Sequence, residues 1–253
     1  MKSAVKYGLV GAVVFGLCLI VTVPAAWVWH LMPNKPKQVQ LSGINGSVWQ
    51  GRIAHARIAG RDIEQLQWQL HPSALLSGHL AASFSMDGGL VQGKGDISYG
   101  LAGLKAEGLR LSAPLPWMVG KQRLPLRTRL DGHATLNVRT LEQGQPWCEQ
   151  LQGRLLVERL DVNNQFGAYP LGNIAGSLAC QQGQVQLKID ESENVIGLNG
   201  ELLLKANNQV EVNAKIRQTE QQPQSLVQAL QFIGKPDSTG AYPVNYSGPI
   251  PGL

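Results

Sequence analysis

The sequence predicts an all-β protein: a single N-terminal transmembrane helix, then an elongated, curved antiparallel β-sheet built as a meander of hairpins, with one or two short peripheral helices. Three observations predict this class. One apolar segment near the N-terminus is long enough to cross a bilayer, apolar and polar residues alternate through much of the remaining chain, and helical patterns are rare. Such alternation is typical of strands that bury one face.

The N-terminal segment at residues 7–29 contains no charged residue. At about 1.5 Å per residue, a helix of this length crosses a hydrocarbon core of about 30 Å. Lys2 and Lys6 precede it and favour a cytoplasmic N-terminus. Tyr7 at one end and Trp29 at the other match the aromatic residues that gather at membrane interfaces. We therefore expect an uncleaved membrane anchor.

Two alternatives to the anchor remain open, a cleaved signal peptide and a buried core helix. The apolar run is longer than the 7–15 residues of a usual signal peptide, and the best cleavage site, Val23–Ala25, contains a proline. No second apolar stretch approaches this length, so a single crossing is expected. The predicted organisation is residues 1–6 cytoplasmic, 7–29 transmembrane, 30–40 a tether and 41–253 one β-rich domain beyond the membrane.

Strand-like alternation follows the tether and is bounded by turn-forming residues. The clearest alternating stretches are residues 130–140, 184–190, 198–206 and 209–217. Turn signals stand at 86–89, 163–164, 181–183 and 206–208. We also interpret the glycine-rich "GKGDIS" at 93–98 as a turn, because phosphate binding would need a strand–loop–helix context that it lacks.

Helical signals are confined to three places. The strongest is residues 223–236, where Pro223 suits a first turn, Leu226 and Leu230 share one face, and Gly234 can end the helix. Residues 71–78 favour a short helical connection. Residues 113–120 favour a loop or a brief helical turn.

The composition argues against catalysis and against nucleic acid. Charged residues make up 15% of the chain, and the net charge of +5 is scattered without a dense basic tract. Nucleic-acid binding needs a focused basic patch, so no nucleic-acid partner is expected. No catalytic motif is present, and Asp190, Glu191 and Glu193 are interpreted as a solvated turn. We expect no enzymatic activity and no cofactor.

Two cysteines, Cys148 and Cys180, lie in the part expected beyond the membrane. Two thiols in an oxidising compartment suggest a disulfide. A metal site would need further ligands, and neither a CxxC nor an HxxxH spacing occurs. We predict a Cys148–Cys180 disulfide and no metal site.

The segment "GSVWQG" at 46–51 has three possible roles: a ligand loop, a membrane-interface anchor or a buried corner of the sheet. Strand-like alternation follows Gly51, where a phosphate-binding loop would lead into a helix. We expect a hairpin corner with residues 47–49 as a short strand and Trp49 beneath the sheet near Trp68. An exposed, partner-binding Trp49 is the alternative.

Four features together carry a family resemblance: one membrane span, two central motifs, and a C-terminal "LxxLxxxG" helix with a tyrosine-containing tail. The motif residues are Gly46, Val48, Trp49 and Gly51, followed by Trp68, Leu70, Pro72, Leu75, Leu76 and Gly78. In this order they resemble the type II secretion system protein N family. A more distant architectural likeness is to the AsmA/TamB-like envelope proteins.

The resemblance implies a non-enzymatic subunit that supports export of folded proteins across the outer membrane of a Gram-negative bacterium. It implies a single-pass inner-membrane protein with a periplasmic C-terminal domain. The implied partners are other secretion-system subunits of the inner-membrane platform and periplasm, and membrane lipid through the anchor. The alternative is an AsmA/TamB-like protein that handles lipid in an apolar β groove.

Overall fold

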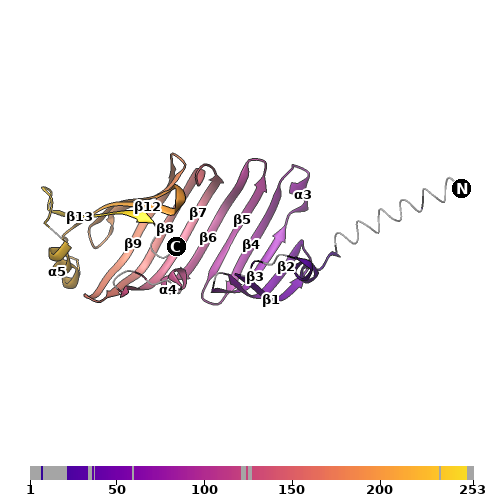
Figure 1. Cartoon of the computed structure of the whole chain (residues 1–253), viewed down its shortest axis with the longest axis horizontal. Coiled ribbons are helices and arrows are strands. Elements are labelled where there is room, and N and C mark those ends of the chain that lie inside the picture. The colour runs from indigo at the N-terminus through magenta and orange to yellow at the C-terminus, as the bar shows by residue number, and fades with distance from the viewer. Residues whose placement is uncertain are drawn as a thin grey trace.

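The computed structural model describes residues 22–33, 38–58, 60–120, 127–233 and 235–249, together with Tyr7, Pro36 and Leu124. These residues form one antiparallel sheet of 13 strands, and each strand pairs with its neighbours in the sequence (Figure 1). The predicted all-β class and the meander of hairpins are therefore confirmed.

The strands vary from short outer strands to long central ones. They are β1 (Val39–Gly46), β2 (Gln50–Ile58), β3 (Arg61–Leu70), β4 (Leu80–Gly88), β5 (Gln92–Gly100), β6 (Gly103–Pro114), β7 (Arg129–Gln143), β8 (Cys148–Asn164), β9 (Gly167–Gln181), β10 (Gln184–Asn194), β11 (Leu198–Lys205), β12 (Gln209–Arg217) and β13 (Ala241–Pro249). The helical elements are α2 (Ala25–Leu31), α3 (Pro72–Leu75), α4 (Leu115–Val119), the 3-10 turn η2 (Ala206–Asn208) and α5 (Gln224–Ile233).

The clearest alternating stretches of the sequence fall in strands β7, β10, β11 and β12. The interpretation of residues 93–98 as a turn is wrong, because they lie inside β5. The glycines there serve close packing. A Cβ atom on Gly93 would lie 2.6 Å from the side chains of both Met86 and Leu111, so glycine lets these two side chains meet over the strand.

All three helical signals of the sequence correspond to helices, which gives one more peripheral helix than expected. Helix α5 ends at Ile233, as its sequence pattern indicates. Helix α2 begins at Ala25, after an extended Pro24 that lies inside the predicted membrane segment, and it ends at Leu31, two residues beyond the predicted end. Within the described part of the chain no helix is long and apolar enough to cross a membrane. Residues 8–21 of the predicted transmembrane helix lie outside the described residues.

Because the sheet is a meander, the connections between consecutive strands lie alternately at its two ends. Helix α3 connects β3 to β4 at the end where β1, β3 and β5 finish, which we call the α3 end. Helices α4 and α5 follow β6 and β12 at the opposite end, which we call the α5 end (Figure 1). Helix α4 is held against the start of β3, since Arg61 donates from Nη2 to the carbonyl oxygen of Met118 at 2.6 Å.

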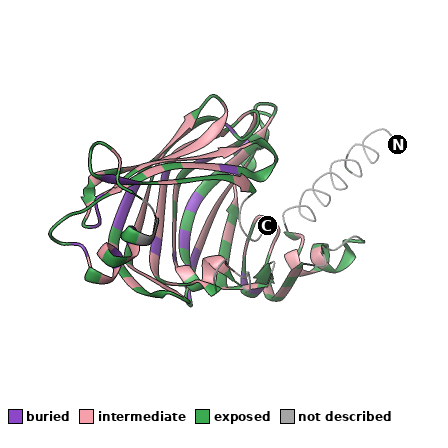
Figure 2. Cartoon of the chain, turned by 60° about the vertical axis from the view of Figure 1, so that its left-hand side comes forward, coloured by how far each residue is buried: buried purple, intermediate pink, exposed green. Residues whose placement is uncertain are grey.

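The main buried cluster lies at the α5 end, where α5 packs on the last strands. It comprises Ile174, Ile196, Leu226, Leu230 and Tyr242. Elsewhere the buried residues are mostly small, and they form short separate stretches on a sheet that is largely half-buried or exposed (Figure 2). The long sheet therefore has only one substantial core in the described residues, at one end.

Candidate binding surfaces

Strand register gives the sheet one apolar row that runs across all 13 strands. Residues directly opposed on neighbouring antiparallel strands share a face. The row is Ile44, Ile53, Leu66, Met86, Gly93, Leu111, Leu136, Leu155, Gly176, Ile189, Gly200, Ala214 and Val244. The pairing thus aligns apolar positions that are scattered over 200 residues of sequence.

The next row along the strands is polar throughout and faces the other side. It is Asn45, Arg52, Gln67, Ser85, Lys94, Arg110, Asn137, Arg154, Ser177, Lys188, Glu201, Asn213 and Asn245. The sheet therefore presents an apolar face and a polar face, each continuous from β1 to β13 along these rows.

The apolar row is only partly covered by the protein itself. Ile53 and Met86 are buried, whereas the leucines of the row on β3, β6, β7 and β8 are half-buried. Helix α5 contributes to the buried cluster only near β9 to β13. Surface of this kind, apolar and incompletely covered, is a candidate for contact with lipid or with another protein.

The polar face has a shallow depression of about 500 Å³ over β5 to β8. Four cationic side chains line it: Lys94, Arg110, Arg139 and Arg154. Arg110 donates to Asn137, and Arg154 is paired with Glu193 of β10 at 2.8 Å. The described residues contain no cluster of His, Cys, Asp and Glu that could hold a metal ion.

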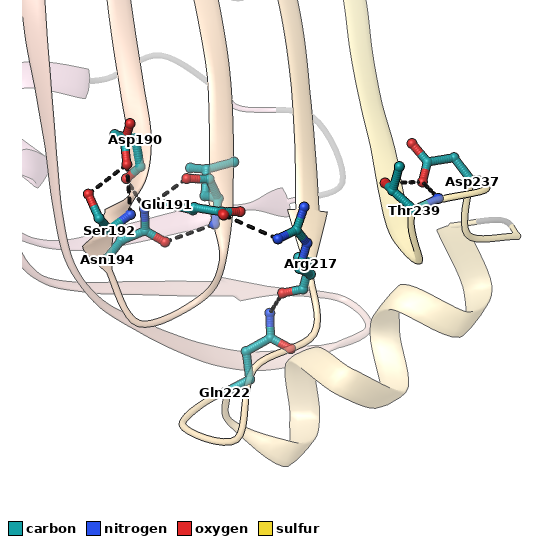
Figure 3. Close-up of polar contacts among 9 residues, drawn as sticks. Asp190, Glu191, Ser192, Asn194, Arg217, Gln222, Asp237 and Thr239 are labelled. Atoms are coloured by element: carbon teal, nitrogen blue, oxygen red, sulfur yellow. Dashed lines mark hydrogen bonds and ion pairs between the residues drawn. The ribbon is translucent and has the colours of Figure 1, made fainter.

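The carboxylates predicted to form a solvated turn lie in an irregular end of β10, after a register shift that follows Ile189 (Figure 3). Asp190 accepts from the hydroxyl and the amide of Ser192, and these bonds lower the pKa of its carboxyl. Glu191 pairs with Arg217 of β12 at 3.2 Å. Glu191 and Glu193 pair with β12 and β8, each the next strand but one from β10, so these acids link strands together.

A second group of polar contacts fixes the two ends of α5. Gln222 is buried, and its amide nitrogen donates to the carbonyl oxygen of Arg217 (Figure 3) and to that of Ile196. Asp237 accepts from Lys215 at 2.7 Å and from Thr239, and the hydrogen bond from the lysine is the main cause of its lowered pKa. These contacts hold α5, the helix that contributes Leu226 and Leu230 to the main buried cluster.

The first motif forms the tight turn between β1 and β2. Gly46 has φ +99°, which favours glycine, and residues 47–49 form a bridge and a bend where a short strand was expected. Trp68 lies opposite Gly51, so close that a Cβ on Gly51 would overlap its ring, and its indole nitrogen donates to the carbonyl oxygen of Val48 at 2.9 Å. Trp49 is half-buried.

The second motif forms the corner from β3 through α3 to β4. The amide of Leu70 donates to the carbonyl oxygen of Trp49 at 2.6 Å, which joins the two motifs. Pro72 begins α3, and Gly78 has φ +75° after it. Leu76 is 92% exposed, so it is available at the surface.

The predicted disulfide is present. Cys148, at the start of β8, is bonded to Cys180, near the end of β9, with a Cα–Cα distance of 6.0 Å. It ties together the ends of two long strands at the α3 end of the sheet. Cys148 is buried.

The two outer strands differ in chemistry. β1 contains neither proline nor a charged residue. β13 contains Pro243 and Pro249, and its only strand partner in the described residues is β12. Proline has no N–H, so at an edge its nitrogen faces away from the partner strand. The outer edge of β13 thus lacks two donors that an added strand would need.

Comparison with known proteins places the chain among secretion-system components. The sequence profile of the family described as "Type II secretion system (T2SS), protein N" matches residues 37–245. A protein of Vibrio cholerae serotype O1, named type II secretion system protein N, is 31% identical over 253 residues, which cover 99% of this chain and 100% of the relative. One of the same name from Aeromonas hydrophila is 29% identical over 254 residues, with 99% and 100% coverage.

A third protein of that name, from Pectobacterium carotovorum, is 20% identical over 248 residues, which cover 98% of each chain. No solved structure matches the chain at a significant level. The profile match and the full-length similarity to the Vibrio protein show that the chain belongs to the type II secretion system protein N family.

Proposed function

We propose that this chain is a non-enzymatic, inner-membrane-anchored subunit of the type II secretion system that works by binding other subunits. The family match over residues 37–245 carries the proposal. The uncharged segment at residues 7–29 would be a single membrane crossing, with the N-terminus in the cytoplasm and the sheet in the periplasm. The disulfide fits the oxidising periplasm.

The asymmetry of the two sheet edges supports β1 as the docking edge. An edge strand offers unpaired backbone donors and acceptors to an extended segment of another chain, and proline blocks such pairing. β1 has no proline or charge, whereas β13 has two prolines. The bridge between Pro24 and Ser47 lies just beyond the end of β1 and leaves Val39–Gly46 without a second strand partner in the described residues.

Site-specific photo-crosslinking tests this assignment. A photoreactive residue replaces Gln40 or Ser42 on β1, and matched controls carry it at Asn245 or Ser247 on β13; all four positions are exposed. We expect secretion-system subunits to be captured from the β1 positions in secreting cells. The proposal is wrong if β1 captures no such subunit and deletion of the gene leaves extracellular enzyme levels unchanged.

The apolar face favours a second candidate function, lipid handling of the AsmA/TamB type. Its support is the apolar row, which spans every strand and remains half-buried over the central strands. Native mass spectrometry of the full chain, released from detergent, measures retained phospholipid. Phospholipid that stays bound and is lost in a Leu136→Glu variant favours this function, and a lipid-free wild-type chain excludes it.

A further inference from the structure

Exposed apolar side chains gather at the α3 end of the sheet. Six of them lie on α3, directly after α3, on β4, β5 and β6 and in the turn between β5 and β6, and we call them the apolar rim: Leu75, Leu76, Leu80, Tyr99, Leu101 and Leu104. Leu80, Tyr99 and Leu104 are directly opposed on neighbouring strands, so they form one continuous row. Leu101 is fully exposed at the tip of the β5–β6 turn. Gathered exposed apolar residues mark a binding surface.

The two ends of the sheet differ in how their apolar residues are covered. At the α5 end, α5 buries its leucines in the main cluster, and α4 packs back against β3. The exposed apolar residues there, Ile58, Leu90, Phe166 and Val195, belong to separate strand ends and turns. At the α3 end, Leu75 in the single-turn helix α3 and Leu76 directly after it are instead exposed to solvent. The rim is therefore a local feature of one end.

Charge distribution fits a membrane surface as the occupant. Residues 71–82 and 97–106, which carry the rim, contain no Asp or Glu. An anionic lipid surface repels carboxylates, and aromatic residues such as Tyr99 favour the interface between headgroups and acyl chains. The absence of acids from both stretches therefore favours an anionic lipid surface as the occupant.

The connection to the N-terminal segment points the same way. The Gly46 end of β1 lies at the α3 end, and the bridge between Pro24 and Ser47 joins the last part of the 7–29 segment to it. In α2, Trp27 and Leu31 are strongly exposed. The segment proposed to cross the membrane therefore leads into the sheet at the same end as the rim.

We propose that the apolar rim inserts into the lipid interface of the membrane that holds the anchor, so that the sheet stands on the bilayer with its α3 end down. The α5 end and most of the two faces would then extend away from the membrane. This inference rests on the membrane anchor of the proposed function. It adds a second contact with the membrane besides the anchor. The rim would lie as deep in the headgroup region as amphipathic surface segments do.

The test uses the full chain in vesicles of phosphatidylethanolamine and phosphatidylglycerol. In a Cys18→Ala background, Leu101→Cys or Leu76→Cys carries an environment-sensitive fluorophore; Leu90→Cys, at the α5 end and 70% exposed, is the matched control. We expect blue-shifted emission at 76 and 101 and loss of intensity when nitroxide-labelled lipid is included. The label at 90 should emit as in water and resist quenching.

The outcomes separate the rim from the anchor. A chain that resists extraction by alkaline carbonate but shows the same emission at 101 as at 90 overturns the rim while the anchor stands. A chain that carbonate extracts, yet whose label at 101 is quenched by added vesicles, overturns the anchor while the rim stands. A blue shift at 101 without lipid quenching, seen only when other secretion-system subunits are present, assigns the rim to a protein partner and overturns the lipid assignment.

Discussion

Replacement of Leu230 by alanine measures how far the main cluster holds the α5 end together. Leu230 is 0% exposed and lies among Ile174, Ile196 and Leu226, of which Ile196 is only 2% exposed. The change removes three carbons, which at about 0.8 kcal/mol each costs about 2.4 kcal/mol. A cavity that such closely packed neighbours cannot fill adds to this, so we expect a total loss of about 3–4 kcal/mol.

The loss is measurable by urea denaturation of the full chain in detergent, followed by tryptophan fluorescence and circular dichroism. The expected result is a lower midpoint for Leu230→Ala than for the wild type with an unchanged slope. Leu76→Ala removes the same three carbons from a side chain that is 92% exposed, and it should change the free energy of unfolding by less than about 0.5 kcal/mol. Equal midpoints for the two variants would refute the assignment of α5 to the core.

Three further predictions concern the hairpin corner, the disulfide and acid stability. Gly51→Ala places a Cβ in the ring of Trp68 and should cost about 1–3 kcal/mol in the same urea assay; wild-type stability would show that this corner can open. Cys180→Ser, which breaks the bond to Cys148, should cost roughly 3–4 kcal/mol; unchanged stability of the reduced wild type would contradict this. Because the pKa of Asp237 is lowered from its ordinary value of 3.8, its ionised carboxylate stabilises the fold above pH 3.8, and this stabilisation is lost as the pH falls below 3.8. Asp237→Asn should therefore flatten the acid side of a pH–stability curve, and a curve like that of the wild type refutes this.

The fold class was predictable because one side of each strand is apolar, and alternation is visible in a single strand. Val185 and Leu187 in β10 show it without any knowledge of their neighbours. The helix at 224–233 was predictable for the same reason, since its apolar positions and its proline are local signals. β5 was missed because Gly93 and Gly95 remove the alternation on the side where neighbouring side chains pack over them.

The surfaces were less predictable because they depend on register between strands. Lys94 lies opposite Arg110, and a register shift follows before Asp96 pairs with Glu107. No local pattern indicates that shift, although it decides which charges share a face. The pairs of Glu191 with Arg217 and of Arg154 with Glu193 likewise join residues 26 and 39 positions apart.

The arrangement of chemistry over the sheet favours a role in binding over one in catalysis. Catalysis needs several polar groups to converge on one protected point. In the described part of this chain, the strand register instead places residues of similar chemistry in rows across the sheet. One row is apolar, from Ile44 to Val244 on one face, and the other is polar, from Asn45 to Asn245 on the opposite face. Extended surfaces of uniform chemistry suit extended partners, such as another polypeptide along an edge or a lipid surface at one end. A small-molecule substrate would leave most of either row without a contact.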